Sequence, residues 1–273
     1  TDRALLDRLL PGVHTVIHAA AHKHVPVGET CPAAFVATNV GGTRTVCLAA
    51  RRAGVKRAVV ISTDKAVLPV SVMGATKYVA ERLVNGLGPG FLVVRFGNVL
   101  DSSGSVLPLW REQIARGGPV TVTDPACTRY FMSMDDACTL ILDTLAFPSE
   151  QGTFVFDMGA PRNMLAMAEA LIEESEQSCL VHVTGLRPGE KLTEELATGE
   201  RTPPPHPRIF AVPSAPPLAQ DNAGLLRLIG VAHQADDAAA RTRLWQVVAV
   251  PSVRPVVPAR AWKPKTEPVT FVV

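Results

Sequence analysis

Four consecutive polar residues, Ser62, Thr63, Asp64 and Lys65, directly follow a largely apolar stretch at 57–61. They bring two hydroxyls, a carboxylate and an amine into one short segment. A positioned carboxyl group can act as a general acid, and a positioned amine as a general base. The group therefore indicates a proton-transfer site. Spacing alone leaves open the alternative that Asp64 only caps the start of a helix.

A second lysine, Lys77, lies in the following segment, 72–85, whose apolar spacing predicts a helix. Near the start of a helix, a lysine can sit beside the ribose of a bound cofactor. The spacing is equally compatible with an exposed helix residue that has no such role.

Small residues follow another apolar stretch at 14–18. They are Ala19, Ala20 and Ala21, and Lys23 comes soon after them. Small side chains let a flat ring or a ribose approach the backbone, and Lys23 could reach an anionic group. Read alone, this segment is also compatible with an ordinary surface loop.

Two arginines later in the chain, Arg129 and Arg187, are suited to a diphosphate. A guanidinium group forms paired hydrogen bonds with phosphate oxygens. The alternative for each arginine is an ordinary surface ion pair.

Histidine and cysteine spacing predicts no metal site. His18, His22 and His24 have the right ligand type, but no carboxylate or cysteine completes the set. The five cysteines are widely scattered and suggest neither a zinc site nor a disulfide framework. We expect them to be small apolar residues in a reducing cytoplasm.

The composition excludes several classes of protein. The chain has 273 residues, of which 47% are hydrophobic and 19% charged, so it is not intrinsically disordered. With 27 Lys and Arg against 25 Asp and Glu, and 5% aromatic residues, it does not suggest a nucleic-acid binder. No apolar run approaches the roughly 18 residues of a membrane span, and no signal segment opens the chain.

Apolar stretches alternate with helical patterns in the first hundred residues. We expect strands at 14–18, 57–61 and 91–95, separated by helices at 32–52 and 72–85. Continuous apolar strands that alternate with helices predict a parallel sheet covered on both faces. An open parallel sheet binds its ligands at the carboxyl ends of its strands, and the polar groups described above follow those ends.

The rest of the chain predicts further elements. Helices are expected at 106–116, 135–147, 163–174, 222–230 and 235–248, and strands at 153–157 and 180–184.

Seven motifs occur together in one order and spacing. They are His18-Ala-Ala-Ala-His-Lys-His-Val-Pro26, Asn39 with Gly41-Gly-Thr43, Ser62-Thr-Asp-Lys-Ala66, Met73-Gly-Ala-Thr-Lys77, Arg95-Phe-Gly-Asn-Val99, Thr128-Arg-Tyr-Phe-Met132 and Leu186-Arg-Pro-Gly-Glu-Lys191. In these motifs, residues 1–250 resemble the bacterial CapD-type nucleotide-sugar 4,6-dehydratases. These are extended short-chain dehydrogenases/reductases that act on UDP-GlcNAc-like substrates in polysaccharide synthesis.

The resemblance implies an internal redox cycle, in which a hydride leaves sugar C4 and returns at C6 after water is lost. Lys65 would remove the C5 proton, and Asp64 would protonate the leaving C6 hydroxyl. Thr63 would assist at the C4 hydroxyl, with Lys77 lowering the cost electrostatically. Met73 stands where most relatives have a catalytic tyrosine, and methionine cannot carry a proton.

The resemblance also implies the binding residues. The cofactor, NAD or NADP, would contact Ala19, Ala20, Ala21, Asn39, Ser62 and Lys77. The UDP-sugar would contact Lys23, Asn98, Arg129 and Arg187. A homo-oligomer is expected for the intact family, with no membrane span in this chain. The expected location is the cytoplasm, either free or as the cytoplasmic catalytic domain of a parent anchored to the inner membrane.

We expect an α/β protein with a partial doubly wound (Rossmann-like) parallel sheet that lacks its first strands. Residues 1–100 would form the later half of an NAD(P)-binding domain, and 101–197 a smaller substrate-binding region interleaved with the last sheet strand. A proline-rich extension with helices would follow at 198–253, and an extended tail at 254–273.

One pattern of the family is missing. A nucleotide-binding sheet of this kind opens with a strand, a glycine-rich turn and a helix that binds the pyrophosphate. Nothing before His14 has this pattern, and Gly86-Leu-Gly-Pro-Gly90 stands after a helix and before a strand, the wrong order. We therefore expect a piece of a longer dehydratase that is inactive alone. The alternatives are a UDP-sugar 4-epimerase of the same superfamily and a non-catalytic UDP-sugar-binding remnant.

Overall fold

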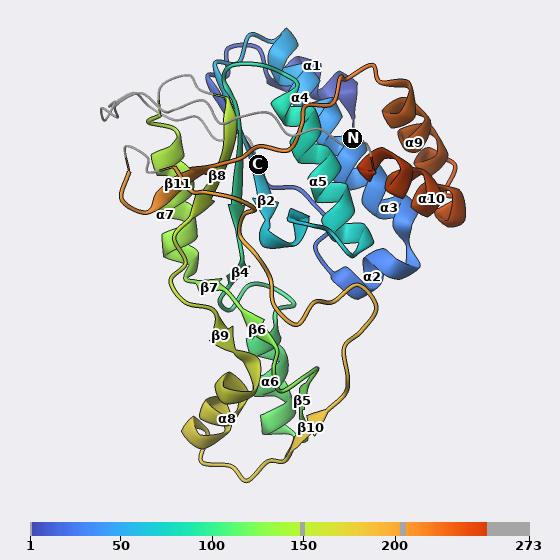
Figure 1. Cartoon of the computed structure of the whole chain (residues 1–273). Coiled ribbons are helices and arrows are strands. Elements are labelled where there is room, and N and C mark those ends of the chain that lie inside the picture. Colours follow the sequence, from blue (N-terminus) through green and yellow to red (C-terminus); the bar gives the residue numbers. More distant parts are fainter. Residues whose placement is uncertain (1, 148–150, 203–205, 250–273) are drawn as a thin grey trace.

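The computed structural model describes residues 2–147, 151–202 and 206–249. The tail expected at 254–273 lies outside these ranges. Within them, a sheet with helices on both faces forms the upper part of the molecule in Figure 1, and a smaller lobe lies below the sheet.

In the described part of the chain, the main sheet has five strands in the order β1-β2-β3-β8-β11. They are β1 (Thr15–His18), β2 (Arg57–Thr63), β3 (Phe91–Phe96), β8 (Gly152–Phe156) and β11 (Ile209–Val212). The first four run parallel, and β11 is antiparallel to β8. Apolar residues on both faces of β2 and β3 explain why this sheet is covered on both sides. The predicted α/β fold with a parallel sheet is confirmed.

The strand register brings the candidate residues to one edge. Ser62 lies opposite Arg95, and Thr63 opposite Phe96. His18, the last residue of β1, lies opposite Val60. Because these strands point the same way, the segments that follow them meet at the carboxyl edge of the sheet.

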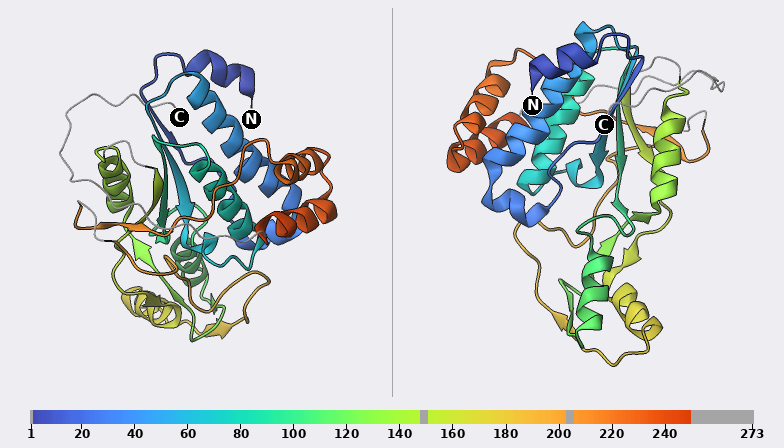
Figure 2. Two further views of the ribbon diagram at one scale, coloured as in Figure 1. Left: turned by 45° about the horizontal axis from the view of Figure 1, so that its top comes forward. Right: turned by 180° about the vertical axis from the view of Figure 1, so that it is seen from behind.

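Helices cover the two faces unequally. On one face lie α3 (Pro32–Phe35), the π-helix η1 (Val36–Gly42), α4 (Thr43–Arg52) and α5 (Val72–Asn85). Outside them lie α9 (Ala223–His233) and α10 (Asp237–Val248), which bury Leu225, Leu228 and Leu244 in the shared core. The other face is covered by α7 (Met134–Thr144), seen on the far side of the sheet from α5 in Figure 2. Two short helices, α1 (Arg3–Leu9) and α2 (Val25–Thr30), pack on the face covered by α4 and α5.

The small lobe has its own core around the buried Trp110. The chain enters this lobe twice, before and after the segment that forms α7 and β8. Its helices are α6 (Val106–Ala115) and α8 (Met164–Glu174). Its strand pairs are β5 (Val120–Val122) with β10 (Val181–Val183) and β6 (Thr128–Arg129) with β9 (Arg162–Asn163). At the junction with the sheet, β4 (Asn98–Val99) pairs with β7 (Phe131–Met132).

Three of the differences between the structure and the sequence expectations concern the sheet, the helix at 32–52 and the small lobe. The helix expected at 32–52 is continuous but contains the π-helical segment, where Gly41 and Gly42 favour the regular helix least. The extension after residue 198 contributes β11, because its apolar run Ile209–Val212 completes the sheet beside β8. The strand expected at 180–184 pairs in the small lobe with β5, a strand the sequence analysis missed.

No helix within the described ranges is both long enough and apolar enough to cross a lipid bilayer.

Candidate active site

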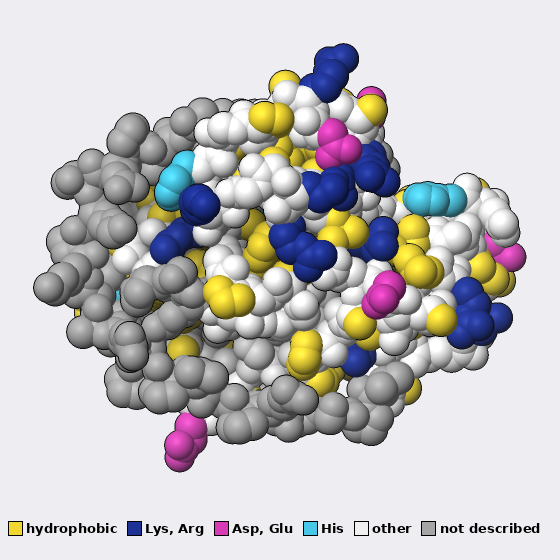
Figure 3. All heavy atoms as spheres, turned by 90° about the horizontal axis from the view of Figure 1, so that it is seen from above, with side chains coloured by type: hydrophobic (Ala, Val, Ile, Leu, Met, Phe, Trp, Pro, Cys, Tyr) yellow, Lys and Arg dark blue, Asp and Glu magenta, His cyan; other side chains and the backbone are white. Residues whose placement is uncertain are grey.

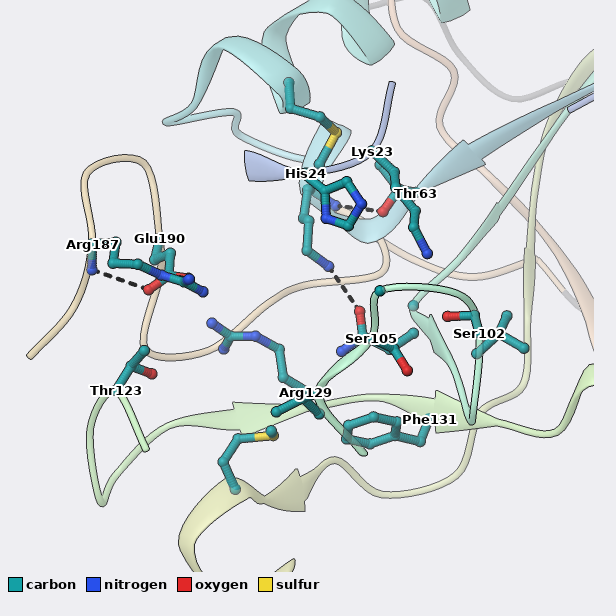
Figure 4. A pocket seen from close by; sticks show the side chains of 18 of the residues that line it. Lys23, His24, Thr63, Ser102, Ser105, Thr123, Arg129, Phe131, Arg187 and Glu190 are labelled. Atoms are coloured by element: carbon teal, nitrogen blue, oxygen red, sulfur yellow. Dashed lines mark hydrogen bonds and ion pairs between the residues drawn. The ribbon is translucent and has the colours of Figure 1, made fainter. Parts of the chain in front are cut away.

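A cavity of about 850 Å³ lies between the carboxyl edge of the sheet and the small lobe. A cavity of this volume is in the range of small-molecule sites. The sheet side contributes Ala19, Thr63 and Lys77 to its wall, and the lobe side contributes Arg129 and Arg187. Figure 4 shows Thr63 on one side of the cavity and the two arginines on the other.

A glycine fixes the start of α5 against the turn that follows β2. This turn is the 3-10 helix η2 (Asp64–Ala66). A Cβ atom at Gly74 would lie 2.2 Å from the carbonyl oxygen of Lys65, so only glycine permits this contact. Because α5 packs this closely on η2, Lys77, one helical turn after Gly74, has a fixed position relative to Asp64 and Lys65.

Four of the predicted site residues form one hydrogen-bonded group. Thr63 Oγ1 donates to Asp64 Oδ1 at 2.8 Å, and Lys65 Nζ donates to the same oxygen at 2.9 Å. Lys65 Nζ also donates to Asn98 Oδ1 at 3.2 Å. The carboxylate therefore holds both the hydroxyl and the amine at the cavity wall.

Asp64 itself is fully buried and does not line the cavity, whereas Thr63 and Lys65 do. Among the described residues, its Oδ2 has no hydrogen-bond partner. An unpaired buried carboxylate oxygen is costly, so the position of Asp64 calls for a functional explanation. In this arrangement Asp64 reaches the cavity only through Thr63 and Lys65.

Lys77 is a buried lysine at the same edge. Its Nζ donates to the carbonyl oxygen of Ile61 at 2.5 Å. Burial lowers the pKa of Lys77 to about 8, although the nearby Glu81 carboxylate acts to raise it. A lysine with this pKa can release its proton near neutral pH. Met73 lines the cavity nearby with a thioether.

Beside Lys77, His18 is held in its neutral form. Burial lowers the pKa of His18 to about 4, and the positive charge of Lys77 acts in the same direction. Its Nε2 lies 3.0 Å from Thr43 Oγ1, whose hydroxyl donates to the carbonyl oxygen of Asn39. Since the hydroxyl has one proton, Nε2 must donate to it. His18 is thus a structural hydrogen-bond donor.

Ser62 lines the cavity, but its hydroxyl points to a buried carboxylate. Ser62 Oγ donates to Glu81 Oε1 at 2.5 Å, and Arg95 Nε donates to the same oxygen at 2.8 Å. Arg95 also binds the other oxygen of Glu81, so the pair is bidentate. Glu81 and Arg95 form a buried ion pair behind the site that the sequence analysis missed. The signal was a glutamate one helical turn after Lys77, on an apolar helix.

The alanine segment after β1 is held by Asn39. Ala19 and Ala21 line the cavity, and Ala20 does not. Asn39 is fully buried and is not in the cavity wall. Its side chain accepts from the amide of His22 at 2.8 Å and donates to the carbonyl oxygen of the same residue at 3.0 Å. It therefore supports the segment that would contact a cofactor.

The two predicted diphosphate arginines differ in their surroundings. Arg129 is buried, and its guanidinium donates to the carbonyl oxygens of Lys191 and Leu192 at 2.7 and 3.0 Å. Arg187 is exposed and forms an ion pair with Glu190 at 2.6 Å. Both line the cavity, and Lys23, also at the wall, donates to the carbonyl oxygen of Ser103.

These features define a class of protein: an α/β protein whose ligand site lies at the carboxyl edge of a parallel sheet and is closed by a second lobe. Sequence comparison gives the family. The profile of a family described as "Polysaccharide biosynthesis protein" matches residues 1–214. The chain belongs to this family.

Two relatives show how far the similarity extends. The probable polysaccharide biosynthesis protein EpsC of Bacillus subtilis is 48% identical over 190 residues, which cover 67% of this chain and 32% of EpsC. A UDP-glucose 4-epimerase of Rickettsia canadensis is 38% identical over 203 residues, which cover 71% of this chain and 59% of the epimerase. The chain therefore spans only 32% of the length of EpsC.

Solved structures share the fold. Pen from Bacillus thuringiensis has a TM-score of 0.73 and 32% identity, over 85% of this chain and 79% of Pen. The dTDP-glucose 4,6-dehydratase DesIV from Streptomyces venezuelae, solved with NAD, has a TM-score of 0.65 and 26% identity, over 71% and 68% of the two chains. The relatives thus include a nucleotide-sugar dehydratase and an epimerase.

Proposed function

We propose that this site, as part of a longer protein, binds a UDP-N-acetylglucosamine-like sugar and carries out its 4,6-dehydration with NAD or NADP, and that residues 1–273 alone do not complete this reaction. The observation that carries the proposal is the Thr63–Asp64–Lys65 group at the cavity wall. It provides a hydroxyl, an amine and a buried carboxylate, all of which can transfer a proton. Met73, at the position of the family's tyrosine, cannot transfer one. A homo-oligomer in the cytoplasm is part of the same proposal, on the resemblance alone.

The sheet side of the cavity fits the nicotinamide end of the cofactor. Ala19 and Ala21 leave room for a flat ring beside the backbone, and Lys77 lies at the same edge. When bound, a nicotinamide dinucleotide supplies the hydride acceptor at sugar C4 and the hydride donor at C6. Asn39 holds the alanine segment, and Ser62 and Glu81 hold the end of β2.

The Asp64–Lys65 pair can supply both proton transfers. When one proton moves from Lys65 to Asp64, the amine becomes a base and the carboxyl an acid. Lys65 then takes the C5 proton, acidified by the C4 ketone, and the C6–O bond breaks. The proton on Asp64 passes through the Thr63 hydroxyl to the leaving oxygen, which departs as water. The elimination returns the pair to its charged form, and Lys65 gives its proton back to C5 when hydride is added at C6. The proton released from the C4 hydroxyl through Thr63 replaces the one lost in the water, so protons balance over the whole cycle.

The lobe side would bind the rest of the substrate. Arg129 and Arg187 would pair with the diphosphate, because guanidinium groups match phosphate oxygens. Lys23 and Asn98, also at the cavity wall, would contact the sugar or the phosphate next to it.

Proton removal at C5 can be tested without added cofactor. The chain is incubated in D₂O with a UDP-4-keto-6-deoxy-N-acetylhexosamine, and deuterium at C5 is measured by NMR. The wild-type chain should exchange the C5 proton. Lys65→Ala should lower the exchange rate about 10²–10⁴-fold, the usual effect of losing one proton-transfer group.

Lys56→Ala is the matched control, because Lys56 is exposed and directly precedes β2, where the strand begins. Figure 3 views that end of the molecule, where Lys and Arg side chains gather on the surface. Equal exchange in Lys65→Ala and Lys56→Ala would contradict the assignment of Lys65.

A 4-epimerase is the second candidate, favoured by the 38% identity to an enzyme of that name. Epimerisation at C4 needs no proton removal at C5. A chain that binds UDP and interconverts C4 epimers with added NAD, without C5 exchange, would establish the epimerase. A chain that binds UDP with neither activity would be a binding protein.

A further inference from the structure

A buried glutamate, Glu194, follows Arg187 in the same segment of the chain. The residue is 7% exposed, whereas its neighbour Glu195 is exposed. Glu194 Oε2 lies 3.7 Å from Lys191 Nζ, and among the described residues it has no hydrogen-bond partner. Burying a carboxylate with only one long ion pair lowers the stability of the fold. A role for the charge of Glu194 at this position would explain why it is buried there.

The charges around Glu194 come from three elements. Burial raises the pKa of Glu194, and Lys65 acts most strongly in the opposite direction. Asp64, beside Lys65 on the turn after β2, raises this pKa, while Lys191 and Arg129 lower it. Glu194 is therefore a carboxylate among three cations, one of which is the proposed C5 base.

Two of these cations, Lys191 and Arg129, also hold the segment at 185–196, which carries Arg187, in place. Lys191 Nζ donates to the carbonyl oxygen of Val67 at 2.7 Å, and Val67 directly follows the turn η2 that contains Asp64 and Lys65. Arg129 donates to the backbone carbonyl oxygens of Lys191 and Leu192. The segment that carries Arg187 is thus fastened to β6 by one cation and to the turn after β2 by another.

We propose that Glu194 is a positioning residue that holds these two walls of the cavity together. As the counter-ion of Lys191 and Lys65, its carboxylate keeps the segment at 185–196 on the turn at 64–67. Nucleotide binding at Arg187 and proton transfer at Lys65 then depend on one buried charge. This inference rests on the proposed function, because it concerns the same site.

Glu194→Gln tests the role of the charge, because glutamine keeps the size of the side chain. Glu195→Gln, an exposed position with the same charge change, is the matched control. The first measurement is hydrogen–deuterium exchange of the free chain. Glu194→Gln should raise exchange at 185–192 and 64–67, while the amides of β3 keep their protection and report an intact fold.

The second measurement is UDP affinity by calorimetry. Removing a negative charge near a diphosphate should by itself tighten binding. A positioning role predicts the opposite sign: Glu194→Gln should weaken UDP binding about fivefold to tenfold, equivalent to about 1–1.4 kcal/mol. Glu195→Gln should leave the affinity unchanged or slightly improved.

The outcomes separate this inference from the proposed function. Unchanged exchange at both segments in Glu194→Gln overturns the positioning role, whatever the affinity. Unchanged or tighter UDP binding also overturns it, even if exchange rises. A wild-type chain that does not bind UDP overturns the proposed function instead, and hydrogen exchange alone then decides the role of Glu194.

Discussion

The two walls of the cavity are built on different principles. On the sheet wall, polar side chains bind one another, as Ser62, Glu81 and Arg95 do in the layer between β2, β3 and α5. On the lobe wall, Arg187 pairs with Glu190 in its own segment, but Arg129, and Lys191 behind the wall, bind backbone carbonyl groups from distant parts of the chain. Figure 4 shows side chains of both walls around the cavity.

This difference indicates what each wall depends on. The sheet wall is fixed by strand register and by the contact at Gly74, so its geometry is set when the sheet forms. The lobe wall is held by charged side chains and by single backbone hydrogen bonds, such as that from Thr128 to Leu192, between segments that share no long strand pairing. Substitutions on the sheet wall should therefore affect folding most, and those on the lobe wall should affect ligand binding most.

Glu81→Ala should give the largest loss of stability. The substitution leaves the Arg95 guanidinium buried without its partner, since the side chains of Glu81 and Arg95 are only 1% and 5% exposed. Removing one member of a buried ion pair costs about 3–5 kcal/mol. Chemical denaturation monitored by circular dichroism would measure the loss as a lower midpoint.

Two controls accompany this measurement. Glu169→Ala, at an exposed position on α8, should change the midpoint little. Replacing Glu81 and Arg95 together by methionine should cost less than Glu81→Ala, because no charge is then left unpaired. Equal midpoints for Glu81→Ala and Glu169→Ala would show that the ion pair does not stabilise the sheet wall.

The sequence predicted the sheet wall better than the lobe wall. The apolar runs at 57–61 and 91–95 and the helix at 72–85 are strong local patterns, and each matches an observed element. Because parallel strands end at one edge, they also placed Thr63, Lys65 and Lys77 together. Local pattern is sufficient where neighbouring elements decide the geometry.

The lobe wall depends on pairings that local pattern does not encode. β5 and β11 are short, and each becomes a strand only because a distant partner lies beside it. Likewise, nothing in the sequence distinguishes Glu194 from Glu195, yet only the first is buried. On the sheet side, the sequence likewise did not show that the side-chain amide of Asn39 binds the backbone of His22, 17 residues earlier in the chain.

The free energy of unfolding should also depend on pH because of His18, at the end of β1 on the sheet side. Its pKa in the folded protein is about 4, below the ordinary 6.5, so between these values the unfolded chain binds more protons. The contribution of His18 to the free energy of unfolding should therefore rise with pH from about 4 to 6.5 and be lost as pH falls through that window. The expected size is up to about 3 kcal/mol.

The comparison of wild type with His18→Gln isolates this effect from the carboxyl groups that titrate in the same range. Glutamine can still donate to Thr43 Oγ1 but does not titrate. Unfolding free energies measured at intervals from pH 4 to 7 should differ between the two proteins by an amount that changes with pH. A constant difference across the range would show that His18 protonates equally in the folded and unfolded chains.

The smallest expected effects separate the two arginines of the lobe wall. Arg129→Ala and Arg187→Ala should each weaken UDP binding at least about tenfold, because a charge-assisted hydrogen bond contributes roughly 1.5–3 kcal/mol. Their effects on folding should differ. Arg187 has a side chain 58% exposed and an ion pair on the surface, so its loss should change stability by less than about 0.5 kcal/mol.

Arg129→Ala should also lower stability, because its guanidinium holds the backbone at Lys191 and Leu192. Arg129→Lys should not restore UDP binding, since an ammonium group cannot reproduce the planar set of donors. Calorimetric titration with UDP and a denaturation curve for each variant provide both readouts. If Arg187→Ala destabilised the fold as much as Arg129→Ala, exposure would not distinguish the two arginines. If neither variant changed UDP affinity, the diphosphate would have to bind outside the lobe wall.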